Sequence, residues 1–542
     1  MSRTPLHSRL QRLFQQASKL YRDRESASEM DSHSLPMSRR RLLQWGGGWL
    51  ASATLPACIT HHANDAAAAL ENADSEAPPA IIVGGGLAGL TAAYYLSKNG
   101  MPCRLFEGAD RLGGRAFTQS NFNAEGMYWE RGAEFIDGSH EEMLNLAREL
   151  GIKLVVLKDD NKGIDEAIYY FGGQVYRDRD FMHSAQPLFR ALQRDLQILQ
   201  MDGETLIPTY QEQMGDAVKA LDRLSLGEYL RRFKDDVDPW LLDLLRVTYV
   251  GEYGLEVDQQ SALNMLALFD AKSKTGPRLY GETGELLKVP GGTNRLISAL
   301  EEQLKARKVP IAMSHRLQAI KSKADGLVLV FDQSGKTVEV KTNRVIIALP
   351  FSVVRKIEGF DKLDMSPVKK EAIRLLGYGT SSKIGLGFQE RFWRQGSPLM
   401  GPSQGTYFTD LPSQVFWDAS RLQKGRSGIL ANLVSGQAGQ SLGTAKLQTA
   451  MADLDKLYHG ASALHDDKKL IQNWSQSPFA LGSTMCPKPG QYTSLIGSPG
   501  EPELNGRLHF IGEHCNVDFM GFMNGAVASG REVALRLMAQ DA

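Results

Sequence analysis

A strand, a glycine-rich turn, a helix and a second strand follow one another near residue 80, and this pattern constrains the fold more than any other feature. The apolar run 80–83 leads into glycines that fit GxGxxG, and the second strand, 103–106, ends in Glu107. In such units the glycines allow a tight turn, close approach of a pyrophosphate and close packing of helix on strand, while the acid accepts hydrogen bonds from a ribose. The glycines are Gly84, Gly86 and Gly89. The pattern therefore predicts a Rossmann-like dinucleotide site, with a helix from Leu90 to Asn99.

A second pair of glycines, flanked by arginines, follows Glu107 almost at once. Gly113 and Gly114 lie between Arg111 and Arg115. This arrangement offers another close approach to the backbone and positive charge for the same pyrophosphate. It favours FAD over NAD as the dinucleotide.

Five segments in order along the chain resemble the flavin amine oxidase family, which includes monoamine oxidases, polyamine oxidases and L-amino acid oxidases. These segments are 81–115, 130–140, 289–296, 345–350 and 510–526. The resemblance implies a mixed α/β and α+β fold, in which a Rossmann-like FAD-binding domain is interleaved with a substrate domain of mixed sheet and helices. We expect the FAD-binding domain to comprise 79–154, 283–358 and 477–542, and the substrate domain 155–282 and 359–476. Within the latter, helices are expected at 191–201, 226–232 and 239–247, the second opened by a Ser225–Glu228 capping box.

The resemblance also implies which residues bind the cofactor. A helix rich in small residues begins at Met523, and its positive N-terminal end would stabilise negative charge on reduced flavin. Ser483 stands where family members with covalent flavin carry cysteine, and Cys486 and Cys515 are out of register, so non-covalent FAD is expected. The expected FAD-binding residues are Gly84, Gly86, Leu87, Ala88, Gly89, Glu107, Gly108, Ala109, Gly113, Gly114, Arg115, Gly132, Ala133, Glu134, Phe135, Trp474, Gly512, Glu513, Phe522 and Met523.

Lys383 is the main catalytic candidate. It lies in an alternating pattern typical of a half-buried strand, among apolar and small neighbours. A lysine on a buried strand face is rare, because desolvating an ammonium group is costly. By resemblance Lys383 holds a water at flavin N5; the alternative is a lysine on the solvent face of the strand.

Three further residues bear on the substrate. Phe522 fills one position of the aromatic cage of monoamine oxidases, but Thr484 stands at the other. Phe135 stands where snake-venom-type amino acid oxidases carry a carboxylate-binding arginine. Asp137 stands where polyamine oxidases place a glutamate or histidine, and a carboxylate there would favour a cationic substrate; the alternative is a turn residue of the Asp-Gly pair.

The implied function is an FAD-dependent amine oxidoreductase. A hydride from the C–H next to an amine would pass to flavin N5, and the imine would hydrolyse to a carbonyl compound plus ammonia or a smaller amine. The electron acceptor would be O2, giving hydrogen peroxide, or a quinone-type molecule. Alternatives are an L-amino acid oxidase or dehydrogenase, a decarboxylating amino acid monooxygenase resembling tryptophan 2-monooxygenase, and a catalytically silent FAD-folded binding protein.

Residues 1–58 read as an export leader, followed by a flexible linker at 59–78. The arginines at 39–41 directly precede an apolar stretch of small residues at 42–57, as in signals for the twin-arginine (Tat) export machinery. Periplasmic or secreted localisation is therefore expected. We expect translation to begin at Met30 or Met37, which would give a signal of usual length; the alternative is an amphipathic surface helix within residues 1–36. Leu55-Pro56-Ala57-Cys58 resembles a lipid-attachment box, although Pro56 fits it poorly.

Composition limits the other classes. The 62 Lys and Arg balance the 62 Asp and Glu, which argues against a nucleic-acid partner. The 4 cysteines lack CxxC spacing, so neither a disulfide scaffold nor a structural metal site is expected. No apolar run reaches the roughly 18 residues of a membrane-spanning helix.

Overall fold

The computed structural model describes residues 79–157, 163–201, 204–205, 207–266, 269–270, 278–279, 286–324, 326–441 and 443–541. The leader, the linker, the twin-arginine signal and Cys58 lie outside the described residues. Within the part that the structure describes, none of the helices has the length and hydrophobicity needed to cross a bilayer.

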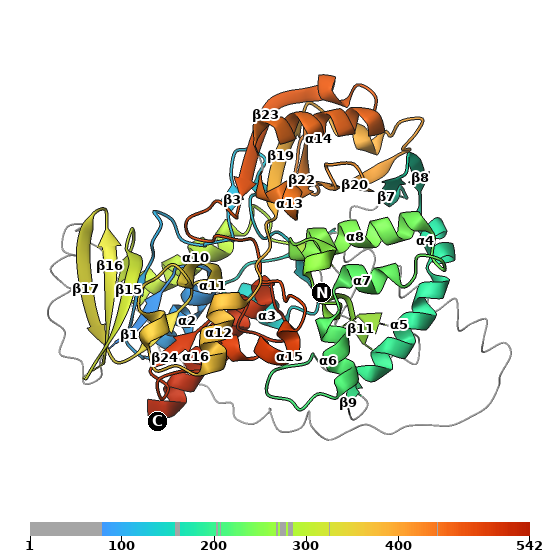
Figure 1. The fold of residues 1–542 in the computed structure, drawn as a ribbon. Helices are drawn as coiled ribbons and strands as arrows, with labels where there is room; N and C mark the ends of the chain where they lie inside the picture. The colour runs from blue at the N-terminus through green and yellow to red at the C-terminus, as the bar shows by residue number, and fades with distance from the viewer. Residues whose placement is uncertain are drawn as a thin grey trace, which may run out of the picture.

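A parallel five-stranded sheet has the order β14-β2-β1-β18-β24, and its strands β1 and β24 lie at the lower left of Figure 1. Distant parts of the chain contribute its strands: β1 (Ala80–Val83), β2 (Cys103–Phe106), β14 (Ile311–Ala312), β18 (Val345–Ile347) and β24 (Leu508–Phe510). Their register is fixed by apolar residues on both faces, as expected for a parallel sheet that is covered on each side.

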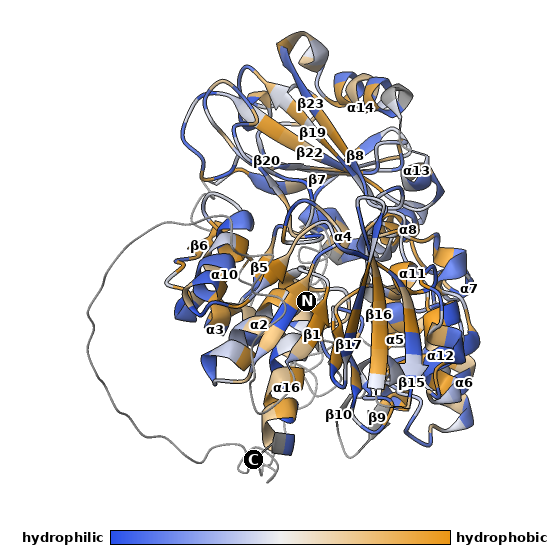
Figure 2. Ribbon diagram, turned by 90° about the vertical axis from the view of Figure 1, so that its left-hand side faces the viewer, coloured by the Kyte–Doolittle hydropathy of each residue, from blue (hydrophilic) through white to orange (hydrophobic). Residues whose placement is uncertain are grey.

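Helices cover one face of this sheet and a small antiparallel sheet covers the other. Helices α2 (Leu87–Lys98), α10 (Asn294–Ala306) and α16 (Met523–Asp541) share an apolar core with Ile82, Leu105 and Ile346. On the other face, strands β15 (Arg316–Lys323), β16 (Gly326–Gln333) and β17 (Lys336–Thr342) form a sheet in which Phe331 stacks on Phe106 at 4.5 Å. Figure 2 shows hydrophobic residues in β1 of the parallel sheet and in β16 of the antiparallel sheet.

A second, seven-stranded sheet has the order β23-β19-β22-β21-β20-β7-β8 and lies at the top of Figure 1. Helix α14 (Thr444–Leu457) packs on one face of it. Its strands are β7 (Asp165–Phe171), β8 (Gln174–Tyr176), β19 (Ser382–Phe388), β20 (Ser403–Thr409), β21 (Val415–Asp418), β22 (Gly428–Val434) and β23 (His465–Asn473).

A group of helices adjoins this sheet, with α8 (Pro239–Tyr253) contacting β7 and β20. The others are α5 (Gln186–Ile198), α6 (Asp216–Arg223) and α7 (Leu226–Arg231). The capping box that the sequence predicts at the start of α7 is confirmed: Ser225 and Glu228 bond each other's backbone N–H groups. The predicted fold class is confirmed, whereas the exact domain boundaries stay a prediction.

Several predicted elements differ from those in the structure. Helix α2 begins at Leu87, because the GxGxxG turn itself supplies its first turn; α5 begins and ends earlier than predicted, and α8 continues to Tyr253. The half-buried pattern predicted for the Lys383 strand is wrong: all seven residues of β19 are buried. Apolar residues around α14 cover one face of β19, and Trp129 presses against Gly385 on the other, where a Cβ would come within 2.7 Å of the indole.

Candidate active site

A cavity of about 750 Å³ runs from the ends of the parallel strands to the seven-stranded sheet. Almost all of the predicted site residues line it, although they come from segments far apart in the chain. Those residues are Gly84, Gly86, Leu87, Ala88, Glu107, Gly108, Ala109, Gly113, Gly114, Arg115, Gly132, Ala133, Glu134, Phe135, Lys383, Trp474, Thr484, Gly512, Glu513, Phe522 and Met523. Gly89 and Asp137 are not among the lining residues.

The glycine turn shapes one end of the cavity. Gly84 has a φ of +107°, which side chains disfavour. A Cβ on Gly86 would have only the Cα of Gly114 nearby, at 4.0 Å, so it would fill the cavity itself. Gly89 does not line the cavity but lets α2 pack closely against the turn, because a Cβ there would lie 2.0 Å from the carbonyl oxygen of Gly84. The glycines thus keep this end open at the N-terminus of α2.

Glu107 lies beside this turn at the end of β2. Its carboxylate accepts hydrogen bonds from the backbone N–H of Gly85 at 2.6 Å and of Ala109 at 2.7 Å. Burial raises its pKa. The carboxylate is therefore fixed in the wall of the cavity, where a ribose hydroxyl can donate to it.

Arg115 links the second glycine pair to the last motif of the chain. Its guanidinium donates to the carboxylate of Glu513 at 2.8 Å and to the carbonyl oxygen of Ser483 at 2.7 Å. Helix α16 begins directly after Phe522, and its first residue, Met523, lines the cavity. The positive N-terminal end of α16 and the fixed guanidinium of Arg115 therefore both lie in the middle part of the cavity, where they can stabilise negative charge.

Lys383 lies at the other end of the cavity. Only 6% of the residue is exposed, and its ammonium donates to the carbonyl oxygen of Gly132 at 3.2 Å and to Glu134 at 3.1 Å. The ring of Trp417 lies 4.9 Å from the ammonium nitrogen. Leu433 and Gln472 are the sheet partners of Lys383 on either side, and both also line the cavity.

Glu134 binds two lysines at once. Its Oε1 pairs with the ammonium of Lys288 at 2.9 Å. Its Oε2, which binds Lys383, also accepts a hydrogen bond from the indole N–H of Trp417 at 3.1 Å. Burial raises the pKa of Glu134, but the two ammonium groups outweigh burial, so that the pKa lies below its usual value. Sequence reasoning missed Lys288; the only available signal was a lysine at the end of the apolar run 286–287.

Asp137 has a different place from the one predicted. It is buried on β5 (Ile136–Asp137), outside the cavity lining, and accepts a hydrogen bond from the backbone N–H of Ser139 at 2.8 Å. The residues before this strand, Glu134 and Phe135, line the cavity, whereas the carboxylate of Asp137 is held by the backbone of the turn that follows it. Of the two interpretations of Asp137, the turn residue agrees with this geometry.

Aromatic rings and one carboxylate complete the Lys383 end. Phe135 and Trp417 have ring centroids 6.1 Å apart, and both line the cavity together with Phe522. Glu252, in the last turn of α8, is a buried lining residue that sequence reasoning missed. Its neighbour Gly251 also lines the cavity and lies close to Leu433, the sheet partner of Lys383, because a Cβ on Gly251 would be 3.9 Å from the Leu433 side chain.

Three arginines are among the described residues that line the cavity: Arg111, Arg115 and Arg316. The guanidinium groups of Arg111 and Arg115 already donate to backbone carbonyl oxygens and, for Arg115, to Glu513. The Cα of Arg316 lies beside Gly108. A substrate carboxylate would therefore have to compete with these protein acceptors for Arg111 or Arg115.

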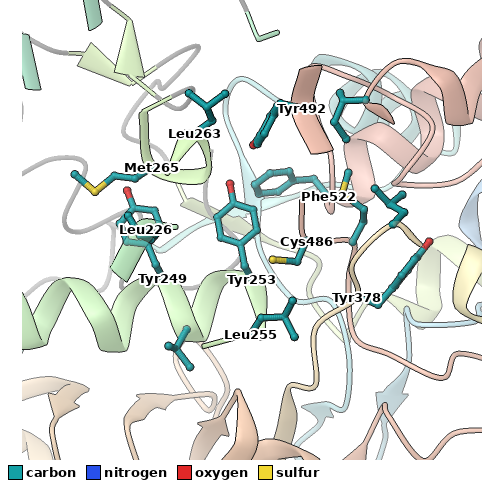
Figure 3. Close-up of a cluster of buried hydrophobic side chains, with 14 of the residues drawn as sticks. Leu226, Tyr249, Tyr253, Leu255, Leu263, Met265, Tyr378, Cys486, Tyr492 and Phe522 are labelled. Atoms are coloured by element: carbon teal, nitrogen blue, oxygen red, sulfur yellow. The ribbon is translucent and has the colours of Figure 1, made fainter. Parts of the chain in front are cut away.

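The cysteines of the described residues also lie outside the cavity lining: Cys103, Cys486 and Cys515. Figure 3 shows Cys486 within a buried cluster that includes Tyr253, Leu255 and Phe522.

Comparison with known proteins agrees with this site. Residues 87–538 match the family model for flavin-containing amine oxidoreductases. A protein of Mycobacterium tuberculosis that carries the name flavin-containing monoamine oxidase is 26% identical over 466 residues, covering 85% of this chain and 96% of its own. An L-amino-acid oxidase of Siganus canaliculatus is 26% identical over 454 residues, covering 80% of each chain.

Solved structures share the fold. Putrescine oxidase bound to putrescine superimposes with a TM-score of 0.68 at 19% identity, covering 85% of this chain and 99% of its own. Cyclohexylamine oxidase from Brevibacterium oxydans gives a TM-score of 0.69 at 17% identity with the same coverage. The family match extends over most of the chain and includes both ends of the cavity, so this protein belongs to the flavin-containing amine oxidoreductase family and is an FAD-dependent amine oxidoreductase.

Proposed function

We propose that the protein oxidises a polyamine-like or other cationic amine with non-covalently bound FAD. The observation that carries this proposal is the make-up of the Lys383 end of the cavity. There the described lining residues include a buried lysine, aromatic rings and the carboxylate of Glu252, while the guanidinium of Arg115 is held by Glu513 and by the carbonyl oxygen of Ser483.

The residues present fit FAD. The space that a Cβ on Gly86 would fill suits a pyrophosphate, with the N-terminus of α2 facing it. Glu107 would hold a ribose, and the start of α16 at Met523 would face the flavin. Because the described cysteines do not line the cavity, non-covalent binding is the form that they support.

When bound, FAD would supply the redox chemistry by accepting a hydride from the carbon next to the amine. The protein's own residues would bind, orient and shield the substrate. Phe135, Trp417 and Phe522 would enclose the reacting amine in its neutral form, and Lys383 would hold a water close to the reacting atoms. Glu252 would pair with a second, charged amino group of the substrate.

The proposal favours amines over amino acids for an electrostatic reason. An amino acid carries a carboxylate, which gains most from a bidentate arginine, and the guanidinium groups of the lining residues Arg111 and Arg115 already donate to acceptors of the protein. The L-amino-acid oxidase among the relatives keeps the alternative open to experiment.

An anaerobic mixing experiment tests the proposal. Purified FAD-loaded protein is mixed with a panel of diamines, polyamines, monoamines and L-amino acids, and loss of the yellow flavin absorbance is followed. We expect bleaching by diamines or polyamines. Bleaching by amino acids alone, with release of a 2-oxo acid or CO2, would identify an amino acid oxidase or monooxygenase instead; no bleaching by any of them would indicate a silent binding protein.

We further propose export through the Tat machinery, on the basis of the arginines at 39–41. The protein would then act in the periplasm or outside the cell, with O2 or a quinone-type molecule as acceptor. Replacing these arginines with lysines should retain the protein in the cytoplasm, as cell fractionation would detect; unchanged export would refute this part.

A further inference from the structure

A buried cluster of three charged side chains forms the wall behind the Lys383 end of the cavity. Glu134 lies between Lys288 and Lys383, with one carboxylate oxygen 2.9 Å and the other 3.1 Å from the respective ammonium nitrogens. The exposed fractions of the three residues are 4%, 3% and 6% in that order. Lys383 and Glu134 line the main cavity, and Lys288 lies one step deeper.

Lys288 is fixed by a hydrogen bond and two aromatic rings in addition to its ion pair with Glu134. It ends β13 (Leu286–Lys288), and its ammonium donates to the carbonyl oxygen of Ala419 at 3.2 Å. The rings of Tyr128 and Phe135 lie 5.7 and 5.8 Å from it. Phe135 lines the main cavity, whereas Tyr128 and Lys288 line a second cavity of about 290 Å³. Lys288 thus stands in the wall between the two cavities.

The charges in this cluster do not balance. Two ammonium groups share one carboxylate, and burying an unbalanced cation is costly unless it serves the site. Burial lowers the pKa of Lys288, but the charge of Glu134 outweighs burial and the net pKa is raised. Lys288 and Glu134 therefore form a stable ion pair, and the surplus positive charge belongs to Lys383, the member nearer the cavity.

We propose that Lys288 is a positioning residue for Lys383 and acts through Glu134. By occupying one carboxylate oxygen, Lys288 partly neutralises Glu134, so that the carboxylate holds Lys383 in place without taking up its whole charge. The surplus charge then stays at the cavity wall, where it stabilises negative charge on a reduced flavin. This inference rests on the proposed function, because it requires flavin at the Lys383 end.

Other titratable groups face the cluster and must be separated from it. Tyr128 and Glu130 interact with Lys288, and Glu252 lines the cavity from α8. Burial outweighs the hydrogen bonds that Glu130 accepts from Thr293 and Thr118 and raises its pKa to about 7. A Glu130→Gln variant identifies any pH step that belongs to this carboxyl group.

The test measures the midpoint potential of bound flavin across a range of pH, anaerobically and without substrate. Lys288→Met removes a cation, so we expect a lower potential of the bound flavin at neutral pH. Lys288→Arg keeps the charge and should restore the potential. Glu134→Gln removes the carboxylate and should raise the potential, because more of the positive charge of the two lysines is then left uncompensated.

Lys369→Met is the matched control. Lys369 is equally buried but lies outside the cavity lining, bonded to the carbonyl oxygens of Pro499 and Glu501. This variant should lower the melting temperature and leave the flavin potential as in the wild type.

A wild-type flavin potential in Lys288→Met, with only the melting temperature reduced, would make Lys288 a structural residue and overturn the inference. If Lys288→Met does not fold, Glu134→Gln decides, and an unchanged flavin potential there overturns the inference equally. Wild-type protein that takes up no FAD would instead overturn the proposed function, and the inference with it. Wild-type protein that takes up FAD but is bleached by none of the amines would refute only the proposed substrate.

Discussion

His514 should make the folded protein sensitive to mild acid. The imidazole is buried against Phe351 and Tyr378, with ring centroids 4.6 and 6.4 Å away, and neither ring nitrogen has a hydrogen-bond partner among the described residues. Burial lowers its pKa from 6.5 to about 4. The native protein therefore resists a proton that the unfolded chain accepts.

The sign and size of the effect follow from this difference. Above pH 6.5 the imidazole is neutral in both states and costs nothing; as the pH falls toward 4, only the unfolded chain binds the proton. Between about pH 7.5 and about pH 5 the two pKa values give a loss of about 2 kcal/mol in the free energy of unfolding.

Urea unfolding, followed by tryptophan fluorescence at these two pH values, measures the loss. His514→Gln should reduce the difference between the two pH values by about 2 kcal/mol relative to wild type. His459→Gln is the control, because His459 is exposed and its replacement should leave the pH dependence unchanged. A His514→Gln variant with the full wild-type pH dependence would refute the reasoning.

Three further changes have defined outcomes. Lys383→Met should slow flavin reduction or reoxidation by roughly an order of magnitude or more in stopped-flow measurements, with FAD content unchanged; wild-type rates would contradict a role beside the flavin. Glu252→Gln should raise KM for a diamine about tenfold, the loss of one charge-assisted hydrogen bond, and leave KM for a monoamine of the same length nearly unchanged; equal effects on both amines would contradict the pairing. Gly89→Ala should lower the melting temperature and the FAD content of the purified protein, because its Cβ would lie 2.0 Å from the carbonyl oxygen of Gly84. Gly215→Ala is the control, because its φ of −63° suits any residue and a Cβ there meets nothing within 4 Å; equal losses in both variants would contradict the packing argument.

The sequence alone determined the nucleotide-binding unit, because its signals are local. The strand at 80–83, the glycines after it and Glu107 follow one another within 28 residues, and each has a backbone reason for its identity. The capping box at Ser225 is another local signal, read from two residues three positions apart. Such features survive in the fold because short-range geometry fixes them whatever packs around them.

Only the tertiary structure decided what surrounds Lys383. The alternating pattern of its strand predicted one solvent-exposed face. In the structure α14 covers one face and Trp129 the other, and both come from distant parts of the chain. Glu134 and Lys288, which form an ion pair, are 154 positions apart in the sequence, and no periodic pattern predicts a contact over such a separation. Asp137 shows the same limit in reverse: the family resemblance placed its carboxylate near the substrate, but in the structure it lies outside the cavity lining and binds the backbone N–H of Ser139. Packing between distant segments sets these directions and partners, and so it sets the charge and shape of the cavity.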